Sequence, residues 1–258
     1  LLGLDYVYLC FDVNEETLPA AVAGLKTCGI RGFNLTMPNK NKIVELLDEL
    51  SPEAQLIGAV NTVLNDNGKL IGYNTDGYGF MQSVRDAGHD ITGKNITVMG
   101  VGGASMAICA QSALDGAASV HIFARRTSRY WNRTQKFAEN LSAKTGCQVC
   151  LFDNDDHTAL RDSIAQSYLL INATSVGMVP DIDDTIIKDT SLFHPELVVA
   201  DVVYEPQETR LLREAKATGC QTFNGMYMLL HQGAKAFQIW TGQEMPVSVI
   251  KEKYFSVK

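Results

Sequence analysis

A strand-like apolar run passes directly into a cluster of glycines and then into a helical pattern at Ile96–Ile108, ITVMGVGGASMAI. The first glycine, Gly100, permits a tight turn, and Gly102 lets the backbone approach a pyrophosphate. Gly103 completes the cluster, and a helix that opens at Ala104 would point its free amides and positive dipole end at phosphates. A second strand pattern, SVHIF, follows at a suitable distance. The segment therefore predicts a nucleotide-binding turn, and an ordinary tight βα turn is the alternative.

Strand patterns alternate with helical patterns along almost the whole chain. The strands are expected at Tyr6–Phe11, Gly32–Leu35, Ala59–Leu64, Leu70–Tyr73, Ile96–Met99, Val120–Phe123, Val149–Phe152, Leu169–Asn172, Val198–Val202 and Gln221–Phe223. Apolar residues at i, i+3, i+4 spacing predict helices at Leu18–Cys28, Lys42–Leu50, Ala104–Leu114, Thr134–Leu141 and Glu208–Thr218. Such alternation predicts βαβ units and parallel sheets, so the expected fold class is α/β.

The 258 residues exceed what one core usually organises, so one large or two modest domains are expected. A fresh βαβ series that begins at Lys94, after the strand ending in GYNTDG, favours two domains with a cleft between them. An N-terminal α/β domain for substrate is expected over residues 1–76, and a Rossmann-type dinucleotide-binding domain over residues 77–229. Helices in residues 230–258 are expected to pack back on the first domain and complete it. The chain begins without Met in an apolar run, LLGLDYVYLCF, so we expect that part of the natural N-terminus precedes it.

Charge and composition exclude several classes of partner. The formal net charge of -7 argues against nucleic acid or an anionic membrane surface, because both need a basic patch. No apolar run approaches the roughly 20 residues that span a bilayer, and the N-terminal run lacks the basic lead of a signal peptide. Six cysteines scattered through apolar segments are typical of a reducing cytosol, so a cytoplasmic protein is expected. Cys147 and Cys150 form a C-x-x-C without a second pair, which favours apolar strand residues over a metal or redox site.

The residues after the second strand of the nucleotide-binding unit bear on which dinucleotide binds. In NAD sites an Asp or Glu there accepts the ribose hydroxyls. Here the strand ends at Phe123 and is followed by Arg125, Arg126 and Arg129, with no acid among them. Guanidinium groups can grip a 2′-phosphate through paired hydrogen bonds. The loop therefore predicts NADP, with NAD possible, and a solvated basic loop is the alternative.

Three polar segments in the first domain carry groups suited to alcohol chemistry. Hydride transfer from an alcohol needs a group that moves the hydroxyl proton. NLTMPNK ends on Lys40, at the carboxyl edge of a strand, where open α/β sheets bind ligands. GAVNT and GYNTDG add amides, hydroxyls and Asp76. A lone lysine is more often a surface charge, but together these groups suit a polyhydroxylated substrate, whose hydroxyls each need a partner when buried.

These segments together resemble the shikimate/quinate 5-dehydrogenase family over essentially all of the chain. The matching segments occur in family order, namely NLTMPNK, GAVNT, GYNTDG, G-x-G-G-A, NATSVGM, DVVYEPQETRLL and MLLHQGAKAF. The segments MPNK, GYNTDGYGF and WTGQEMP are most similar to the quinate/shikimate branch. The resemblance implies reversible NAD(P)-dependent oxidation of shikimate to 3-dehydroshikimate in aromatic amino-acid biosynthesis, and also of quinate to 3-dehydroquinate. It implies a small-molecule substrate, no resident metal, and a monomer or homodimer.

The resemblance also implies roles for individual residues. Lys40 and Asp76 would be the catalytic pair, and either could accept the proton. The substrate contacts would be Thr36, Asn61, Tyr204 and Gln232. The cofactor contacts would be Gly100, Gly102, Gly103 and Ala104 at the phosphates, Arg125 and Thr127 at the adenosine phosphate, and Thr174, Val202 and Gly225 along the nicotinamide.

Four features depart from the family pattern. The family's Ser-x-Ser carboxylate clamp would lie upstream of the first residue. Ala124 stands where an asparagine usually opens the adenosine loop, Tyr227 replaces a glycine near the nicotinamide, and Thr127 stands where the quinate/shikimate branch often has an acid. Two other functions remain open: a non-catalytic NADP-binding sensor, and a two-domain dehydrogenase of another small substrate.

Overall fold

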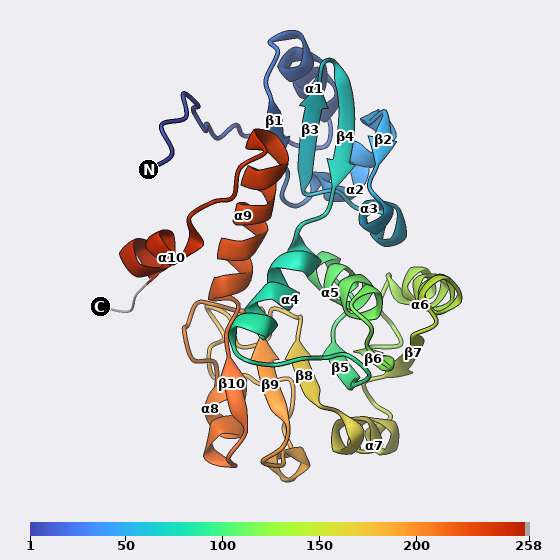
Figure 1. Ribbon diagram of the computed structural model, residues 1–258. Helices are drawn as coiled ribbons and strands as arrows, with labels where there is room; N and C mark the ends of the chain where they lie inside the picture. The colour runs from blue at the N-terminus through green and yellow to red at the C-terminus, as the bar shows by residue number, and fades with distance from the viewer. Residues whose placement is uncertain (256–258) are drawn as a thin grey trace. The chain divides into compact units, whose positions relative to one another are not determined.

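The computed structural model describes residues 1–255, which divide into two compact units (Figure 1). Unit 1 comprises Leu1–Thr75 and Gly233–Lys258, and unit 2 comprises Asp76–Gln232. Unit 1 is therefore built from both ends of the chain, whereas unit 2 is continuous. Within residues 1–255, no helix combines the length and the apolarity that crossing a bilayer demands.

A four-stranded mixed sheet in the order β1-β3-β4-β2 forms the centre of unit 1. Its strands are β1 (Gly32–Asn34), β2 (Glu49–Leu50), β3 (Thr62–Asp66) and β4 (Lys69–Tyr73). β3 pairs antiparallel with β1 and β4, and only β2 runs parallel to β4. The parallel sheet expected for this part of the chain is therefore wrong. The cause is the turn Asn67–Gly68, whose two positive φ angles of 53° and 91° suit a tight hairpin between antiparallel strands.

Short helices flank this sheet. They are α1 (Leu18–Thr27), α2 (Asn39–Lys42), the 3-10 helix η1 (Ile43–Leu46), α3 (Pro52–Ile57), the part of α9 from Gly233 on, α10 (Val247–Ile250) and the π-helical turn η3 (Lys251–Phe255). The helix expected at Lys42–Leu50 is wrong beyond Leu46, because Leu47 is extended and Leu50 pairs with Gly72 of β4. Leu18, Ile43, Val63 and Leu70 belong to the core that joins these helices to the sheet.

The strand expected at Tyr6–Phe11 is absent from the described residues. The segment has no regular secondary structure and is exposed, with Val7 85% and Phe11 62% accessible. An alternating apolar pattern makes a strand only where a neighbour completes its hydrogen-bond ladder, and none of its backbone groups enters a ladder within residues 1–255. Side chains hold it instead, as where the Tyr8 hydroxyl donates to Asn34 Oδ1 over 2.9 Å.

The last part of α9 packs on the edge of the unit 1 sheet. Trp240 Nε1 donates to the carbonyl of Val63 over 2.9 Å, and Arg31 Nε donates to the carbonyl of Trp240 over 2.9 Å. A Cβ on Gly32 would overlap the indole ring, so glycine on β1 makes room for Trp240. This packing attaches the C-terminal part of the chain to the N-terminal sheet.

Unit 2 is built on a six-stranded sheet in the order β10-β9-β8-β5-β6-β7, with every pair parallel. The strands are β5 (Asn95–Met99), β6 (Ser119–Ala124), β7 (Gln148–Asp153), β8 (Leu169–Asn172), β9 (Val198–Asp201) and β10 (Gln221–Phe223). All six lie within one or two residues of their expected bounds, and the α/β class is confirmed. The order of the strands reverses between β5 and β8, and parallel sheets bind ligands at such a switch point.

The helices of unit 2 are α4 (Asp76–Asp86), α5 (Gly103–Leu114), α6 (Trp131–Thr145), α7 (His157–Gln166), the 3-10 helix η2 (Thr190–Leu192), α8 (Arg210–Ala217) and the start of α9 (Met226–Thr241). Ile164 of α7 and Leu211 of α8 share one buried cluster with Phe123, Leu170 and Val199 of the sheet. Helices α4, α5 and α6 pack against one another in sequence order. The helix that follows the glycine turn, α5, is thus packed between α4 and α6.

Candidate active site

Gly100 directly follows strand β5 at the switch point of the unit 2 sheet. Its φ is +112°, and a Cβ there would stand 2.8 Å from Thr174 Cγ2 and 2.9 Å from the carbonyl oxygen of Ala173. Met99, just before it, is in register with Asn172 of β8. Both the backbone conformation and the close approach of the neighbouring strand therefore require glycine. The structure brings Gly100 and Thr174, two of the expected cofactor residues, together.

The other two glycines of the turn face open space. Gly102 and Gly103 are exposed, and a Cβ on either would meet nothing within 4 Å. Helix α5 begins here without a side-chain cap, beside the half-buried Ala104. Ser105 Oγ donates to the carbonyl of Gly100 over 2.6 Å and fixes the turn. Uncapped amides above an open surface fit the pyrophosphate of a dinucleotide.

The arginine loop after β6 presents fewer guanidiniums than its sequence suggests. Arg126 lies over the ring of Trp131 at 4.6 Å, and Arg129 lies over the ring of Tyr130 at 4.7 Å. Both cations are thus engaged by aromatic faces. Arg125 is exposed, and its guanidinium makes no ion pair in the part of the chain that the structure describes. Arg125 is therefore the member of the loop best placed to meet a 2′-phosphate, with the exposed Thr127 beside it.

Sequence reasoning missed an acid at this loop. Asp153, the last residue of β7, is in register with Ala124 of β6, and its Oδ1 accepts a hydrogen bond from the amide of Arg126 over 3.3 Å. The sequence offers no acid directly after Phe123, but a parallel neighbouring strand brings one to the same sheet edge. The adjacency of the strand ends is the signal that could have found it.

The segments expected along the nicotinamide meet at the ends of β8 and β9. Asn172 Oδ1 accepts from the Thr174 amide over 3.1 Å, and Asn172 Nδ2 donates to Asp201 Oδ1 over 3.0 Å. The amide of Val202 donates to the carbonyl of Asn172 over 2.9 Å. A Cβ on Gly225 would overlap the carbonyl of Val202, so glycine permits that approach. Thr174, Val202 and Gly225 are therefore neighbours, as the family pattern implies.

Asp201 supports this loop cluster from within the protein. Its carboxyl group is fully buried, and burial raises its pKa above the usual value. Hydrogen bonds from the Val203 amide, from Asn172 and from the Thr209 hydroxyl act in the opposite direction. These three donors satisfy the buried oxygens, so Asp201 holds the ends of β8 and β9 and the start of α8 in place.

In unit 1, hydrogen bonds gather three of the expected catalytic segments. The carbonyl of Lys40 accepts from the amide of Val60 over 2.8 Å, next to Asn61. Asn61 Oδ1 accepts from the amide of Thr75, and Asn61 Nδ2 donates to the Thr75 hydroxyl, each over 2.9 Å. Thr75 directly precedes Asp76 in the chain. The start of the Lys40 helix, Asn61 and the chain leading into Asp76 are thus held in one network.

Further polar groups extend the network around Asn61. Asn34 Nδ2 donates to the carbonyl of Asn61 over 3.1 Å and to the hydroxyl of Thr62 over 3.0 Å. Asn61 and Thr62 are buried, whereas Thr36 is exposed in the loop after β1. The sequence assigns no role to Asn34 or Thr62, although both stand in the quoted motifs. The arrangement supplies several hydrogen-bonding groups close together, as a substrate rich in hydroxyls requires.

In unit 2, Asp76 begins α4 and Gln232 lies on α9, and the two helices touch backbone to backbone. Asp76 is buried, with 8% of its surface accessible. A Cβ on Gly79 would stand 2.7 Å from the amide nitrogen of Gln232 and 2.7 Å from the carbonyl oxygen of Met228. One turn separates Gly79 from Asp76 on α4. The close contact therefore fixes Gln232 relative to Asp76.

Two further contacts hold α4. A Cβ on Gly77 would overlap the carbonyl of Ala107, so α4 also approaches α5 closely. At the far end of α4, Asp86 Oδ2 meets Nε2 of the buried His231 at 2.9 Å. Neither the glycine contacts nor this pair was expected. The helix that carries Asp76 is thus fixed against both the helix of the glycine turn and the helix of Gln232.

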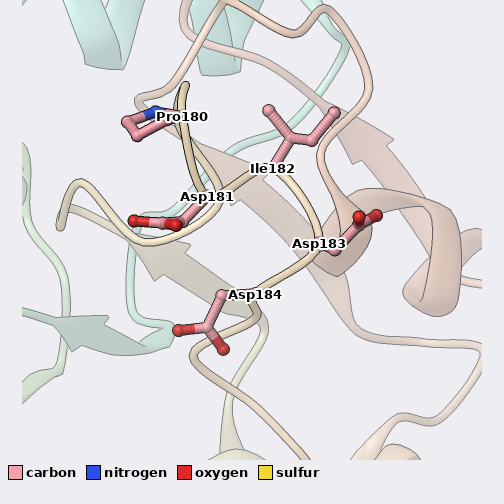
Figure 2. Close-up of a pocket in the computed structure, with 5 residues that line it drawn as sticks. All are labelled: Pro180, Asp181, Ile182, Asp183 and Asp184. Carbon is pink, nitrogen blue, oxygen red and sulfur yellow. The ribbon is translucent and has the colours of Figure 1, made fainter.

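One further expected residue, Tyr204, and one pocket also lie in unit 2. Tyr204 is 43% accessible, in the loop after β9. An open pocket of about 360 Å³ is lined by Pro180, Asp181, Ile182, Asp183 and Asp184. Figure 2 shows these five residues along one loop. The pocket's three carboxylates and absence of a lining cation make it unsuited to phosphates or to an acidic substrate. Across residues 1–255, no group of His, Cys, Asp and Glu side chains has the arrangement of a metal site.

Comparison with family models finds matches at both ends of the chain. The model described as "Shikimate dehydrogenase substrate binding domain" matches residues 1–63. The model described as "Shikimate 5'-dehydrogenase C-terminal domain" matches residues 225–253. Both matches fall largely in unit 1, which contains the Lys40 network.

Individual relatives match over nearly the whole length. A shikimate dehydrogenase (NADP(+)) of Listeria innocua is 52% identical over 254 residues, which is 98% of this chain and 87% of that protein. The shikimate 5-dehydrogenase of Listeria monocytogenes, solved with shikimate and NAD, is 51% identical with a TM-score of 0.95, over 97% of this chain and 86% of its own. The quinate dehydrogenase of Corynebacterium glutamicum, solved with NAD, is 33% identical with a TM-score of 0.82, over 93% and 83%.

Proposed function

Because the chain belongs to the shikimate dehydrogenase family, we propose that it oxidises shikimate reversibly to 3-dehydroshikimate with NADP. This is the oxidoreductase step that the family performs in aromatic amino-acid biosynthesis. The observation that carries the proposal is the hydrogen-bond network through Asn61, which gathers the Lys40 helix and the chain leading into Asp76. A protein that only sensed NADP would keep the glycine turn without needing this second polar cluster.

The cofactor residues are proposed on the geometry of unit 2. When bound, NADP supplies a nicotinamide ring that accepts a hydride. The glycine turn and the start of α5 would hold its pyrophosphate, and Arg125 with Thr127 would hold the adenosine phosphate. Thr174, Val202 and Gly225 would line the nicotinamide. The open surface at Gly102 and Gly103 and the exposed guanidinium of Arg125 support this assignment.

Lys40 and Asp76 are proposed as the catalytic pair. As the carbinol carbon loses its hydride, the hydroxyl group must release a proton, and the pair receives it. Lys40 then holds or returns the proton at Nζ, and Asp76 orients the pair through its carboxylate, or the two roles are exchanged. Thr36, Asn61, Tyr204 and Gln232 would bind the ring hydroxyls. Since a buried hydroxyl without a partner is costly, these contacts select a polyhydroxylated acid.

Quinate is proposed as a second substrate. The segment GYNTDGYGF is similar to the quinate/shikimate branch, and a quinate dehydrogenase is among the related structures. Quinate carries one more hydroxyl than shikimate, so an enzyme that accepts both needs a hydrogen-bonding group to spare near the ring.

The roles of the two units and the cellular setting are also proposals. We assign substrate binding to unit 1 and cofactor binding to unit 2, since the Lys40 network and the glycine turn fall in them respectively. A cytoplasmic enzyme is supported by the six free cysteines, including Cys147 and Cys150. The partner is a small molecule rather than nucleic acid or membrane, and the assembly is a monomer or a homodimer.

A four-way steady-state assay tests the proposed function. Shikimate and quinate are each oxidised with NADP and with NAD, and kcat/KM is compared. The highest value is expected for shikimate with NADP, followed by measurable turnover of quinate. NADP binding without turnover of either acid would favour a sensor. Turnover of neither acid, with NADP-dependent oxidation of another alcohol, would favour a different dehydrogenase.

A further inference from the structure

We propose that Asp153 sets the balance between NADP and NAD by opposing the hold of Arg125 on a 2′-phosphate. The inference rests on the proposed use of a dinucleotide in unit 2. It adds a specificity-determining residue that lies on a different strand from the arginine loop.

The end of β7 is joined to the arginine loop on both sides of Arg125. Before it, Ala124 is in register with Asp153, and the carbonyl of Ala124 accepts from the amide of Asn154 over 2.9 Å. After it, the amide of Arg126 donates to Asp153 Oδ1 over 3.3 Å. Arg125 therefore leaves the backbone between two residues that contact the end of β7. An anion bound by Arg125 would therefore lie on the side of the sheet end where the Asp153 carboxylate stands.

The Asp153 carboxylate is only partly used by the loop. Asp153 is half-buried, and its Oδ1 also accepts from the amide of Asp155 over 3.2 Å. Both bonds end on Oδ1, and within residues 1–255 Oδ2 receives no hydrogen bond. An acid at this sheet edge with one open oxygen is what a ribose hydroxyl needs as an acceptor. Asp153 thus supplies from β7 the acid that is missing after β6.

The surrounding charges do not cancel this carboxylate. Arg126 and Arg129 are turned onto Trp131 and Tyr130, at 4.6 Å and 4.7 Å from the ring centres. Arg125 alone among these three arginines extends without a partner in the described chain. The stacked guanidiniums keep their charge but are held at the rings, so the direct grip on a 2′-phosphate would come from Arg125 and the repulsion from Asp153. A 2′-hydroxyl would meet no repulsion and an open acceptor.

The repulsion acts on discrimination between the two cofactors. Two like charges several ångströms apart at a hydrated surface interact weakly, because water and salt screen them. We expect the Asp153 charge to weaken binding of a 2′-phosphate by about three- to tenfold relative to a 2′-hydroxyl. Arg125 would then make binding of NADP the stronger of the two, and Asp153 would keep the difference small enough for NAD to bind as well.

Asp153→Asn tests the proposal, because asparagine keeps the Oδ1 acceptor and removes the charge. The probes are adenosine 2′,5′-bisphosphate and 5′-AMP, titrated into the full protein by calorimetry. The ratio of their Kd values should shift about three- to tenfold toward the bisphosphate. The shift should shrink between about 0.05 and about 0.5 M salt. The matched control is Asp155→Asn, which removes the same charge from the next exposed position and should leave the ratio unchanged.

Several outcomes separate this proposal from the proposed function. An unchanged ratio in Asp153→Asn overturns the inference, as does an equal shift in Asp155→Asn, which would indicate a general charge effect. Failure of wild type to bind either probe overturns both the inference and the cofactor assignment. The expected shift in a protein that turns over neither shikimate nor quinate would support the inference and reject the proposed function.

Discussion

Gly79 and Gln232 lie so close that a Cβ on the glycine would stand 2.7 Å from the glutamine's amide nitrogen. Both partners are helix backbone, in α4 and α9, so neither can rotate aside as a side chain would. Gly79 follows Asp76 by one helical turn. The contact therefore sets the position of the α4 start relative to Gln232 more rigidly than side-chain packing could.

Gly79→Ala should damage both stability and turnover. Overpacking a rigid contact typically costs about 1–3 kcal/mol, and the helices can relieve it only by moving apart. We expect a loss of this size in the free energy of unfolding, measured by denaturant titration, and a lower kcat. Gly233→Ala is the control, because Gly233 follows Gln232 on α9 and a Cβ there meets nothing within 4 Å. It should gain about 0.4–1 kcal/mol. Equal effects of the two substitutions would show that the contact is not tight.

Lys40→Ala and Asp76→Ala should each abolish most of the turnover. Loss of proton transfer usually lowers a rate by about 10²- to 10⁴-fold. The dissociation constant for NADP should change little, since neither side chain belongs to the glycine turn. Lys42→Ala is the control, because Lys42 stands on the same helix as Lys40 and pairs at the surface with Glu45 over 3.7 Å. Near-native kcat across the pH range in either variant would show that the acid/base assignment is wrong.

Arg125→Ala should weaken NADP selectively. A charge-assisted hydrogen bond is worth about 1.5–3 kcal/mol, and an exposed guanidinium delivers the low end because it is screened. We expect the KM for NADP to rise about tenfold while the KM for NAD barely changes. Arg126→Ala should have a smaller effect on both, because Arg126 is stacked on Trp131. A wild-type enzyme that used NAD more efficiently than NADP would contradict this interpretation of the loop.

The stability of unit 2 should fall in mild acid through His89. Burial lowers the pKa of His89 below its usual value of 6.5, and its Nδ1 lies 2.9 Å from the Tyr168 hydroxyl. The folded state then binds a proton less readily than the unfolded state. The contribution of His89 is fully present above pH 6.5 and is lost as the pH falls toward the lowered pKa.

His89→Gln should flatten that pH dependence. The free energy of unfolding of wild type and variant, measured from about pH 5 to about pH 7.5, should converge toward the acid side. His157→Gln is the control, because His157 is exposed at the start of α7. Parallel curves for wild type and His89→Gln would show that the burial of His89 has no consequence for acid stability.

The Rossmann-type sheet is predictable from the sequence because each strand is a short apolar run flanked by turn residues. Leu169–Asn172 and Gln221–Phe223 have the same bounds in prediction and structure. Unit 1 is harder, because its strands depend on partners distant in the chain. Leu50 is extended since it pairs with Gly72, and the local helical pattern of Lys42–Leu50 cannot reveal that partner.

The candidate site, too, has residues that the sequence indicates and residues that only the folded structure reveals. The order of the motifs along the chain is enough to indicate Gly100, Thr174 and Asn61. Asp153 and the turned side chain of Arg126 could not be predicted, since register with Ala124 and stacking on Trp131 are relations across strands and helices. Arginines counted along a loop do not show which guanidiniums are free to turn toward a ligand, because stacking on an aromatic ring fixes the position of some of them.

Construction of unit 1 from both ends of the chain has a consequence for synthesis on the ribosome. Unit 2 is continuous, so all of its strands are available before the last part of α9 emerges. The space that Gly32 leaves on β1 stays unfilled until Trp240 has been synthesised, after every strand of unit 2. The chain has two tryptophans, Trp131 in unit 2 and Trp240 in unit 1. The indole fluorescence of stalled nascent chains would therefore report the order in which the two halves acquire their packing.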